Sequence, residues 1–289
     1  MSALGWLVEP WGYDFMVRAL VITLVVSVVG AMLSAWLVHI GWSLLGDAVS
    51  HAVLPGVVIA PLVGLPYAAG ALVFGLLAVW LIQEVRLTTR IKEDAAIGVV
   101  FSTLFAGGLV LISATTSEVD RGHILFGNMF GISDIDMTQV MGLALAAALI
   151  IVWWRKRFTW FAFDSAHMAS LGGRPRLTSA VMLVTLAMVA VAALQAVGVV
   201  LVVAMVIIPG ATAHLLTNRI GHMLWLAPLI ASLATIVGLY VSYYADTAPG
   251  GTVVLAHGLG FVLAYVFGRY GVLRYRRTTA ATSTPAEAP

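Results

Sequence analysis

The chain has 289 residues, of which 61% are hydrophobic and 10% are charged, and its mean hydropathy is +1.03. Because a soluble domain carries roughly 25% charged residues, this composition excludes an ordinary water-soluble protein and indicates an integral membrane protein. The formal net charge is only +2, and the absence of cysteine excludes disulfides, thiolate metal sites and thiol nucleophiles.

Apolar runs long enough to cross a bilayer follow one another along almost the whole chain. A spanning helix needs about 20 mostly apolar residues. The candidate spans are residues 15–38, 48–65, 66–82, 95–114, 137–154, 177–216, 223–243 and 252–270. The run at 177–216 is about twice one span, and Gly198 and Pro209-Gly210 interrupt it. It therefore contains either two helices or one helix with a re-entrant segment.

The distribution of charge among the loops predicts the orientation, because Lys and Arg accumulate in cytoplasmic loops. Basic residues gather at 86–92, 155–176 and 274–277, whereas the loop at 115–136 is mainly acidic. We expect an all-α polytopic protein with nine crossings, an outer N-terminus and a cytoplasmic C-terminus; eight crossings remain the alternative. We assign residues 1–276 to one transmembrane domain and residues 277–289 to a disordered cytoplasmic tail.

The second span carries two ionisable side chains in the stretch GDAVSHAVLPG (46–56). Asp47 and His51 are four positions apart, so on a helix they share one face with their Cβ atoms about 5–6 Å apart. Pro55 has no N–H, so the carbonyl group of His51 loses its helical donor and the helix breaks there. Oxygen and nitrogen donors without sulfur suit divalent manganese, iron or zinc. The stretch is therefore a candidate cation site.

A purely structural interpretation of this pair remains open from the residues alone. Asp47 follows Gly46 and could cap a helix by accepting from the backbone N–H of Val49 or Ser50, while His51 could bond to a neighbouring helix. Against this, ionisable residues inside a membrane are costly and usually functional.

The later spans contain one proline and two histidines for which a functional role is less strongly indicated. Pro209 removes the helical donor for the carbonyl group of Met205 and could form a hinge, a pore-facing break or a structural kink. His214 and His257 could line a path, although a lone membrane histidine more often bonds a neighbouring helix. Two stripes of small residues indicate close helix packing within the chain, and a contact between two copies is the alternative. They are Ser27, Ala31 and Ala35, and Gly260, Ala264 and Gly268.

Motifs of the common catalytic and nucleotide-binding sites are absent. The sequence contains no GxxxxGK[ST], HExxH or GxSxG, and no basic surface interleaved with aromatic residues that would indicate nucleic-acid binding. The sequence favours transport over chemistry on a substrate.

Several segments resemble one known family. GDAVSHAVLPG resembles the signature of the membrane permeases of manganese, zinc and iron ABC importers. KEDAAIGVVFSTLFAGGLVLIS (92–113), HILFGNMFGIS (123–133), AVGVVLVVAMVIIPGATAHLLT (196–217) and APGGTVVL (248–255) resemble further segments of that family, in the same order and spacing. The likeness extends over roughly residues 10–272.

The resemblance implies a permease of the bacterial cytoplasmic membrane that is not itself an enzyme and holds no permanent cofactor. It implies a homodimer that works with two cytoplasmic ATPase subunits and an extracytoplasmic metal-binding lipoprotein. In this family the aspartate and histidine of the signature, here Asp47 and His51, coordinate the divalent cation in transit.

The stretch FAFDSAHMASLGG (161–173) resembles the cytoplasmic segment with which the family couples to its ATPase. The matching residues are Phe163, Asp164, Ser165, Ala166, His167, Met168, Ala169, Ser170, Leu171 and Gly172. The chain departs from the family at Ser165 and Ala166, where proline and an acidic residue are common. His39-Ile40-Gly41 replaces a frequent Arg-Arg, and His214 replaces a frequent Arg.

The transported metal and the energy source are predicted less directly. The HILFGN segment is more similar to the manganese or iron branch, which favours manganese, although the same two donors would hold zinc more tightly. A gradient-driven secondary transporter, with Asp47 and His51 as a proton relay, is the alternative. An intramembrane metallohydrolase lacks the usual three ligands.

Overall fold

The computed structural model of the chain describes residues 9–115 and 131–273, and within these ranges every regular element is a helix. The helices are η1 (Glu9–Gly12), α2 (Asp14–Ile40), α3 (Ser43–Ala52), α4 (Leu54–Leu62), α5 (Tyr67–Thr88), α6 (Glu93–Ala114), α8 (Asp134–Phe163), α9 (Ser165–Ser170), α10 (Pro175–Val197), α11 (Val199–Leu216), α12 (Ile220–Ala245) and α13 (Pro249–Phe267). The predicted tail at 277–289 and most of the loop at 115–136 lie outside the described residues.

The long helices are apolar around most of their circumference, as helices in lipid must be. Eight stretches of the described chain are long and apolar enough to cross a membrane, when α3 and α4 are taken together as Ser43–Leu62. The others are α2, α5, α6, α8, α10, α12 and α13. The predicted all-α polytopic fold is therefore confirmed.

Helix α11 is shorter but also runs through the bundle. Gly198, with φ of 79°, separates it from α10. At one end, a Cβ on Gly250 at the start of α13 would lie 3.6 Å from the carbonyl oxygen of Val197. At the other end, the N–H of Tyr270 donates to the carbonyl of Leu215 at 3.1 Å. Helix α11 thus accompanies α13 along its length, as a shorter apolar helix in addition to the eight candidate spans.

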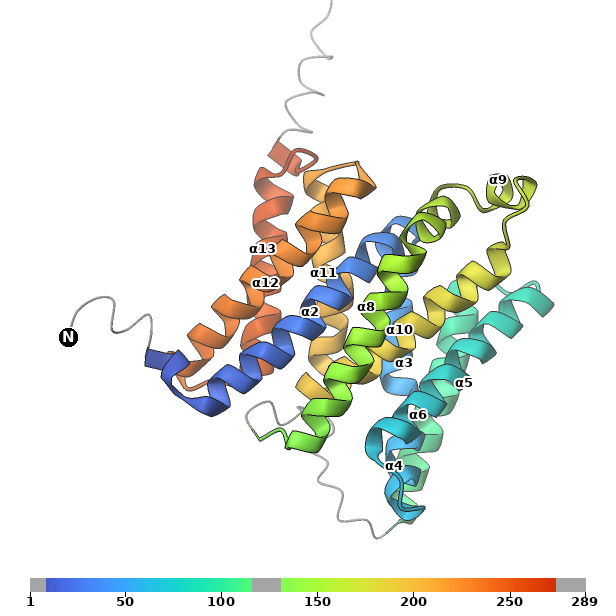
Figure 1. Cartoon of the computed structure of the whole chain (residues 1–289). Helices are drawn as coiled ribbons and strands as arrows, with labels where there is room; N and C mark the ends of the chain where they lie inside the picture. The colour runs from blue at the N-terminus through green and yellow to red at the C-terminus, as the bar shows by residue number, and fades with distance from the viewer. Residues whose placement is uncertain (1–8, 116–130, 274–289) are drawn as a thin grey trace, which may run out of the picture.

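Helix α2 lies at the centre and packs against α8, α10, α11 and α12 (Figure 1). Its small-residue stripe, Ser27, Ala31 and Ala35, is fully buried, and the hydroxyl of Ser27 accepts from the hydroxyl of Thr235 on α12 at 3.1 Å. This stripe therefore packs within the chain, as expected. At the α8 contact, the indole N–H of the buried Trp36 donates to Thr159 at 3.1 Å.

The α3–α4 span and α5 approach each other more closely than side chains normally allow. A Cβ on Gly56 would lie 2.1 Å from the carbonyl oxygen of Gly70, and a Cβ on Gly70 would lie 2.1 Å from that of Gly56. Only glycine fits at both positions, which is the small-residue packing typical of membrane helices. The contact fixes the α3–α4 span against its neighbour.

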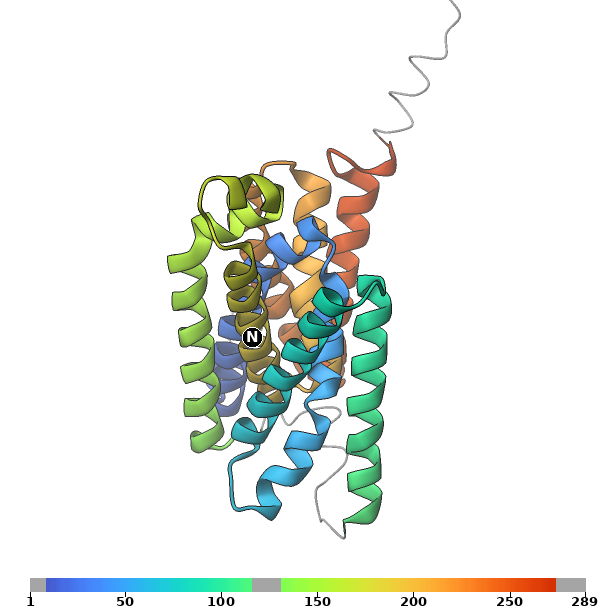
Figure 2. The same ribbon diagram turned by 90° about the vertical axis from the view of Figure 1, so that its right-hand side faces the viewer.

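Charged residues tie helices together at the ends of the bundle. Arg86 pairs with Glu93 at 3.1 Å and places its guanidinium 4.7 Å from the ring centre of Trp42, just before α3. The α5–α6 turn and α9 lie towards one end of the bundle, and the start of α2 lies towards the other (Figures 1 and 2). There Arg18 pairs with Asp14 and Asp134.

Candidate metal site

The predicted helix break lies between α3 and α4 and consists of a single residue. Val53 separates the two helices but keeps α-helical dihedrals, φ −76° and ψ −12°. Pro55 occupies the first turn of α4, where a missing N–H costs least. The N–H of Val57 donates to the carbonyl of Val53 at 3.1 Å. The span is therefore interrupted at Val53, two residues before Pro55, without reversing direction.

Asp47 and His51 come together on α3, one turn before the interruption. His51 Nδ1 lies 3.2 Å from Asp47 Oδ1 and 3.0 Å from the Asp47 carbonyl oxygen. Helix α3 begins at Ser43 with Trp42 as its N-cap, so Asp47 is an interior residue and the capping interpretation is wrong. The side chain of Asp47 is 39% exposed and that of His51 is 27% exposed, so a cation can reach them.

An aromatic pair on α6 holds the imidazole on one side. The rings of Phe101 and Phe105 both meet His51 edge-on, each with its centroid 5.5 Å from that of the imidazole, and they stack on each other at 5.9 Å. The hydroxyl of Ser50 donates to the Asp47 carbonyl at 2.8 Å. Neither phenylalanine is among the residues predicted from the sequence, although their spacing of four residues is a signal for a shared helix face.

The geometry of the pair suits bidentate capture of a cation. Two ligands bonded at about 2.0–2.2 Å and at right angles lie about 3 Å apart, close to the observed 3.2 Å between Nδ1 and Oδ1. Alternatively, Nδ1–H donates to Asp47 and leaves the lone pair of Nε2 for the metal, as histidine ligands commonly do. Both arrangements require a neutral imidazole.

One copy of the chain supplies too few ligands for a closed metal site. Within residues 9–115 and 131–273, no group of three or more His, Asp or Glu side chains could hold a metal ion. Two donors fall short of the four that zinc usually takes and of the six in an octahedral site. The remaining ligands must come from water, backbone or another chain.

Pro209, the second predicted helix break, does not end a helix, because α11 continues through it. This helix packs behind the candidate site. The hydroxyl of Ser34 on α2 accepts from the N–H of Gly210 at 3.0 Å and donates to the carbonyl of Ile207 at 3.3 Å. A Cβ on Gly46, next to Asp47, would lie 3.0 Å from the side chain of Val206. Helix α11 thus packs directly on the helix that carries the candidate ligands.

Three other histidines in the described part of the chain have contacts of their own. His257 is fully buried, and its Nδ1 lies 2.9 Å from the carbonyl oxygen of Val253 on its own helix. His39 and His214 meet at the ends of α2 and α11, with ring centroids 6.3 Å apart. His39 also lies 4.7 Å, between ring centroids, from Phe163 at the end of α8. The sequence gives no sign that His39 and His214, which are 175 positions apart, are neighbours.

The segment 163–172 forms a short capped helix at the end of the bundle (Figure 1). Asp164 is the N-cap of α9, and its carboxylate accepts from the N–H of His167 at 2.8 Å. Met168 is buried, whereas Phe163 and Leu171 are 58% and 69% exposed. The two exposed apolar side chains thus flank α9, Phe163 as the last residue of α8 and Leu171 as the C-cap of α9.

Comparisons with known proteins agree with these features. The chain matches the model of the ABC 3 transport family over residues 12–268. It is 42% identical to the manganese transport system membrane protein MntB of Synechocystis over 93% of this chain and 88% of that protein. It is also 42% identical to the chelated iron transport system membrane protein YfeC of Yersinia pestis, over 98% and 97% of the two chains.

Solved structures show the same fold. One chain of PsaBC from Streptococcus pneumoniae in complex with Fab superposes with a TM-score of 0.85 and 34% identity, covering 96% of this chain and 100% of that chain. An inward-facing putative metal-chelate type ABC transporter gives a TM-score of 0.66 at 16% identity, covering 90% of this chain and 86% of that chain, and supports the fold alone. The chain therefore belongs to the ABC 3 transport family and is a multi-pass membrane permease of an ABC metal importer.

Proposed function

We propose that this permease moves a divalent transition metal, manganese in the first place, into the cell by way of Asp47 and His51. The observation that carries the proposal is the pairing of a carboxylate oxygen and an imidazole nitrogen 3.2 Å apart on a partly exposed face of α3. The pair lies beside the interruption at Val53, inside an otherwise apolar span.

The working unit is a homodimer. Each copy offers two protein ligands, so two copies that face each other at α3 would offer four, which is enough to hold a cation briefly with water or backbone oxygens. A site shared between copies also opens when the copies rock apart, which lets the cation leave.

Likeness supports manganese and iron alike, and we place manganese first because of the HILFGN segment. MntB of Synechocystis and MntC of Listeria innocua are named for manganese transport, whereas YfeC is named for chelated iron. The donors themselves do not select manganese, since zinc binds more tightly to the same oxygen and nitrogen ligands. Selectivity therefore belongs mainly to an extracytoplasmic metal-binding protein that delivers the ion.

Energy comes from separate cytoplasmic ATPase subunits that dock on α9. Docking of the ATPase on α9 requires that this end of the bundle faces the cytoplasm. The α5–α6 turn and the C-terminus lie at the same end, and the start of α2 faces outward. The basic residues around α9 support this assignment, because Lys and Arg concentrate on the cytoplasmic side.

Transport of radiolabelled manganese by the assembled importer tests the proposal. Asp47→Asn and His51→Ala should each reduce ATP-driven uptake on the order of a hundredfold, because the first removes the negative charge of the carboxylate ligand and the second removes the imidazole nitrogen. Matched controls are Asp246→Asn and His222→Ala, which alter an exposed aspartate and an exposed histidine far along the chain and should leave uptake unchanged. Normal transport by either α3 variant would refute the role of the pair.

A further inference from the structure

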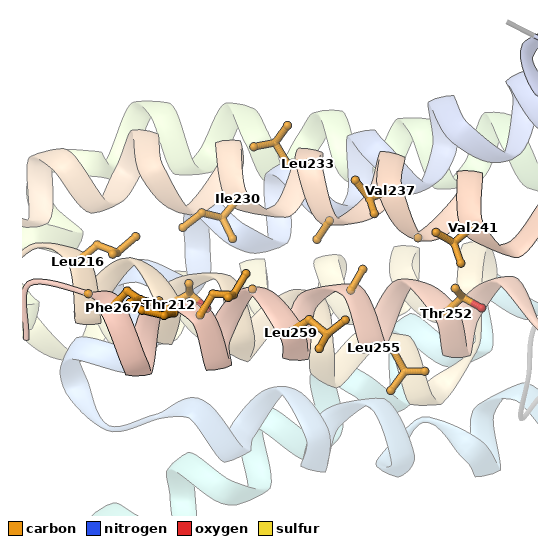
Figure 3. A pocket seen from close by; sticks show the side chains of 17 residues that line it. Thr212, Leu216, Ile230, Leu233, Val237, Val241, Thr252, Leu255, Leu259 and Phe267 are labelled. Atoms are coloured by element: carbon orange, nitrogen blue, oxygen red, sulfur yellow. The ribbon is translucent and has the colours of Figure 1, made fainter. Parts of the chain in front are cut away.

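A long apolar groove of about 760 Å³ lies between α12 and α13, with the end of α11 as its floor (Figure 3). It runs from Val241 and Thr252 at one end to Leu216 and Phe267 at the other (Figure 3). A Cβ added to Gly260 would have no atom within 4 Å, so the groove is open at this glycine. The stripe at 260–268, predicted to pack within the chain, thus lines this groove.

The groove offers no free polar group to an occupant. Its two threonine hydroxyls already donate within their own helices, Thr212 to the carbonyl of Ile208 at 2.7 Å and Thr252 to that of Ala248 at 3.0 Å. Every other side chain that lines it is aliphatic or aromatic. Only an apolar partner can fill it without losing hydrogen bonds to water.

Positive charge collects at the end of the groove near Leu216 and Phe267. Arg219 is the N-cap of α12 and Arg269 follows Gly268, which lines the groove. Both arginines are exposed, and neither forms an ion pair within the described part of the chain. From residue 199 to residue 273 the only acidic residue is Asp246, at the opposite end of α12.

The lining and the charge of the groove favour one kind of occupant. Flexible hydrocarbon chains can follow a narrow apolar channel, and they need no hydrogen-bond partners from it. Basic sites at the ends of membrane helices bind anionic lipid headgroups.

We propose that the α12–α13 groove is a binding site for an anionic phospholipid. Its acyl chains lie along Leu233, Leu255 and Leu259, and its phosphate pairs with Arg219 and Arg269. The lipid lies along the seam at which α12 and α13 pack together, where a Cβ on Gly238 would lie 2.5 Å from the Cα of Val253, and so supports the helix pair that packs on α11. The inference does not depend on the transported metal or on the role of Asp47 and His51.

Native mass spectrometry of the full-length permease in detergent tests this site. The probes are phosphatidylglycerol and phosphatidylcholine with identical acyl chains, added separately. We expect phosphatidylglycerol to bind about thirtyfold more tightly, because each of the two arginines near the headgroup contributes on the order of 1 kcal/mol. The Arg219→Gln/Arg269→Gln variant should lose that preference, whereas Arg174→Gln/Arg176→Gln, an exposed pair elsewhere, should keep it.

A second variant tests the apolar part of the site. Gly260→Leu places a side chain in the groove and should weaken the binding of both lipids severalfold while the permease elutes as a folded species. Equal binding of the two lipids, or no change in the double arginine variant, would overturn the proposal. Because the chain has no cysteine, Leu259→Cys also reports on a rival occupant: disulfide cross-linking between copies at Leu259 would show that a second permease fills the groove.

Discussion

At the scale of single residues, the site depends on how the imidazole of His51 is held. One side of the ring is bonded to Asp47 and another is enclosed by Phe101 and Phe105. The sequence motif was enough to predict the two ligands and their shared face. It could not predict the phenylalanines, because α6 meets α3 only through tertiary packing between segments about 50 residues apart along the chain.

The aromatic contact leads to a prediction at position 105. Phe105→Ala removes one of the two aromatic rings that contact His51 and lets the imidazole turn away from the cation path. Manganese uptake should therefore fall about tenfold. Phe105→Leu keeps most of the apolar volume and should retain at least half of the uptake. Radiolabelled uptake normalised to the amount of folded permease provides the comparison. Equal uptake in both variants would show that the Phe105 ring does not position His51.

At the scale of helices, the sequence was enough to predict the spans from their hydrophobic length. Glycine and proline marked the interruption near Pro55 and the division of the run at 177–216. Contacts between distant segments could not be predicted in this way. Ser34 bonds to Gly210 across 176 positions of sequence, and Gly56 meets Gly70 backbone to backbone. Small residues in a membrane helix are common, so their spacing alone does not say which helices they join.

The glycine contact between α4 and α5 gives a stability prediction. Gly70→Ala would place a methyl group 2.1 Å from the carbonyl oxygen of Gly56, which forces the helices apart. We expect the thermal unfolding midpoint in detergent to fall by at least several degrees, in line with the 1–3 kcal/mol typical of overpacking. Gly107→Ala on α6 has no atom within 4 Å of its new Cβ and should unfold like the parent. Identical midpoints for all three proteins would disprove the tight contact.

The cap of α9 gives a prediction about coupling. Asp164→Ala removes the acceptor for the N–H of His167 and should destabilise this short helix by about 1 kcal/mol, whereas Asn is as good an N-cap as Asp. ATP-driven uptake and co-purification of the ATPase should therefore drop in Asp164→Ala and persist in Asp164→Asn. If Asp164→Ala couples normally, α9 does not need its cap to dock.

At the scale of the whole molecule, the proposed orientation rests on nine passages through the membrane. An odd number places the described ends, Glu9 and Leu273, on opposite sides, and the parallel course of α11 and α13 makes the number odd. Loop charge predicted this topology, but the sequence could not decide whether the run at 177–216 crosses twice. Whether this run crosses twice depends on the turn of the chain at Gly198, which has a φ of 79°.

Topology can be tested directly, because the chain has no cysteine of its own. Ala248→Cys and His222→Cys place exposed thiols at opposite ends of α12. In intact cells a membrane-impermeant maleimide should label position 248 and leave position 222 unlabelled until the membrane is permeabilised. Labelling of position 222 in intact cells, with position 248 protected, would reverse the orientation.

The most direct measurement of the central claim is anomalous scattering from crystals of the assembled importer soaked in Mn²⁺. The account predicts one peak between two copies of the permease, with Asp47 and His51 of each copy at bonding distance, about 2.2 Å, and no such peak in the Asp47→Asn variant. A manganese peak elsewhere along the permease, with the α3 pairs of both copies remote from it, would contradict the claim.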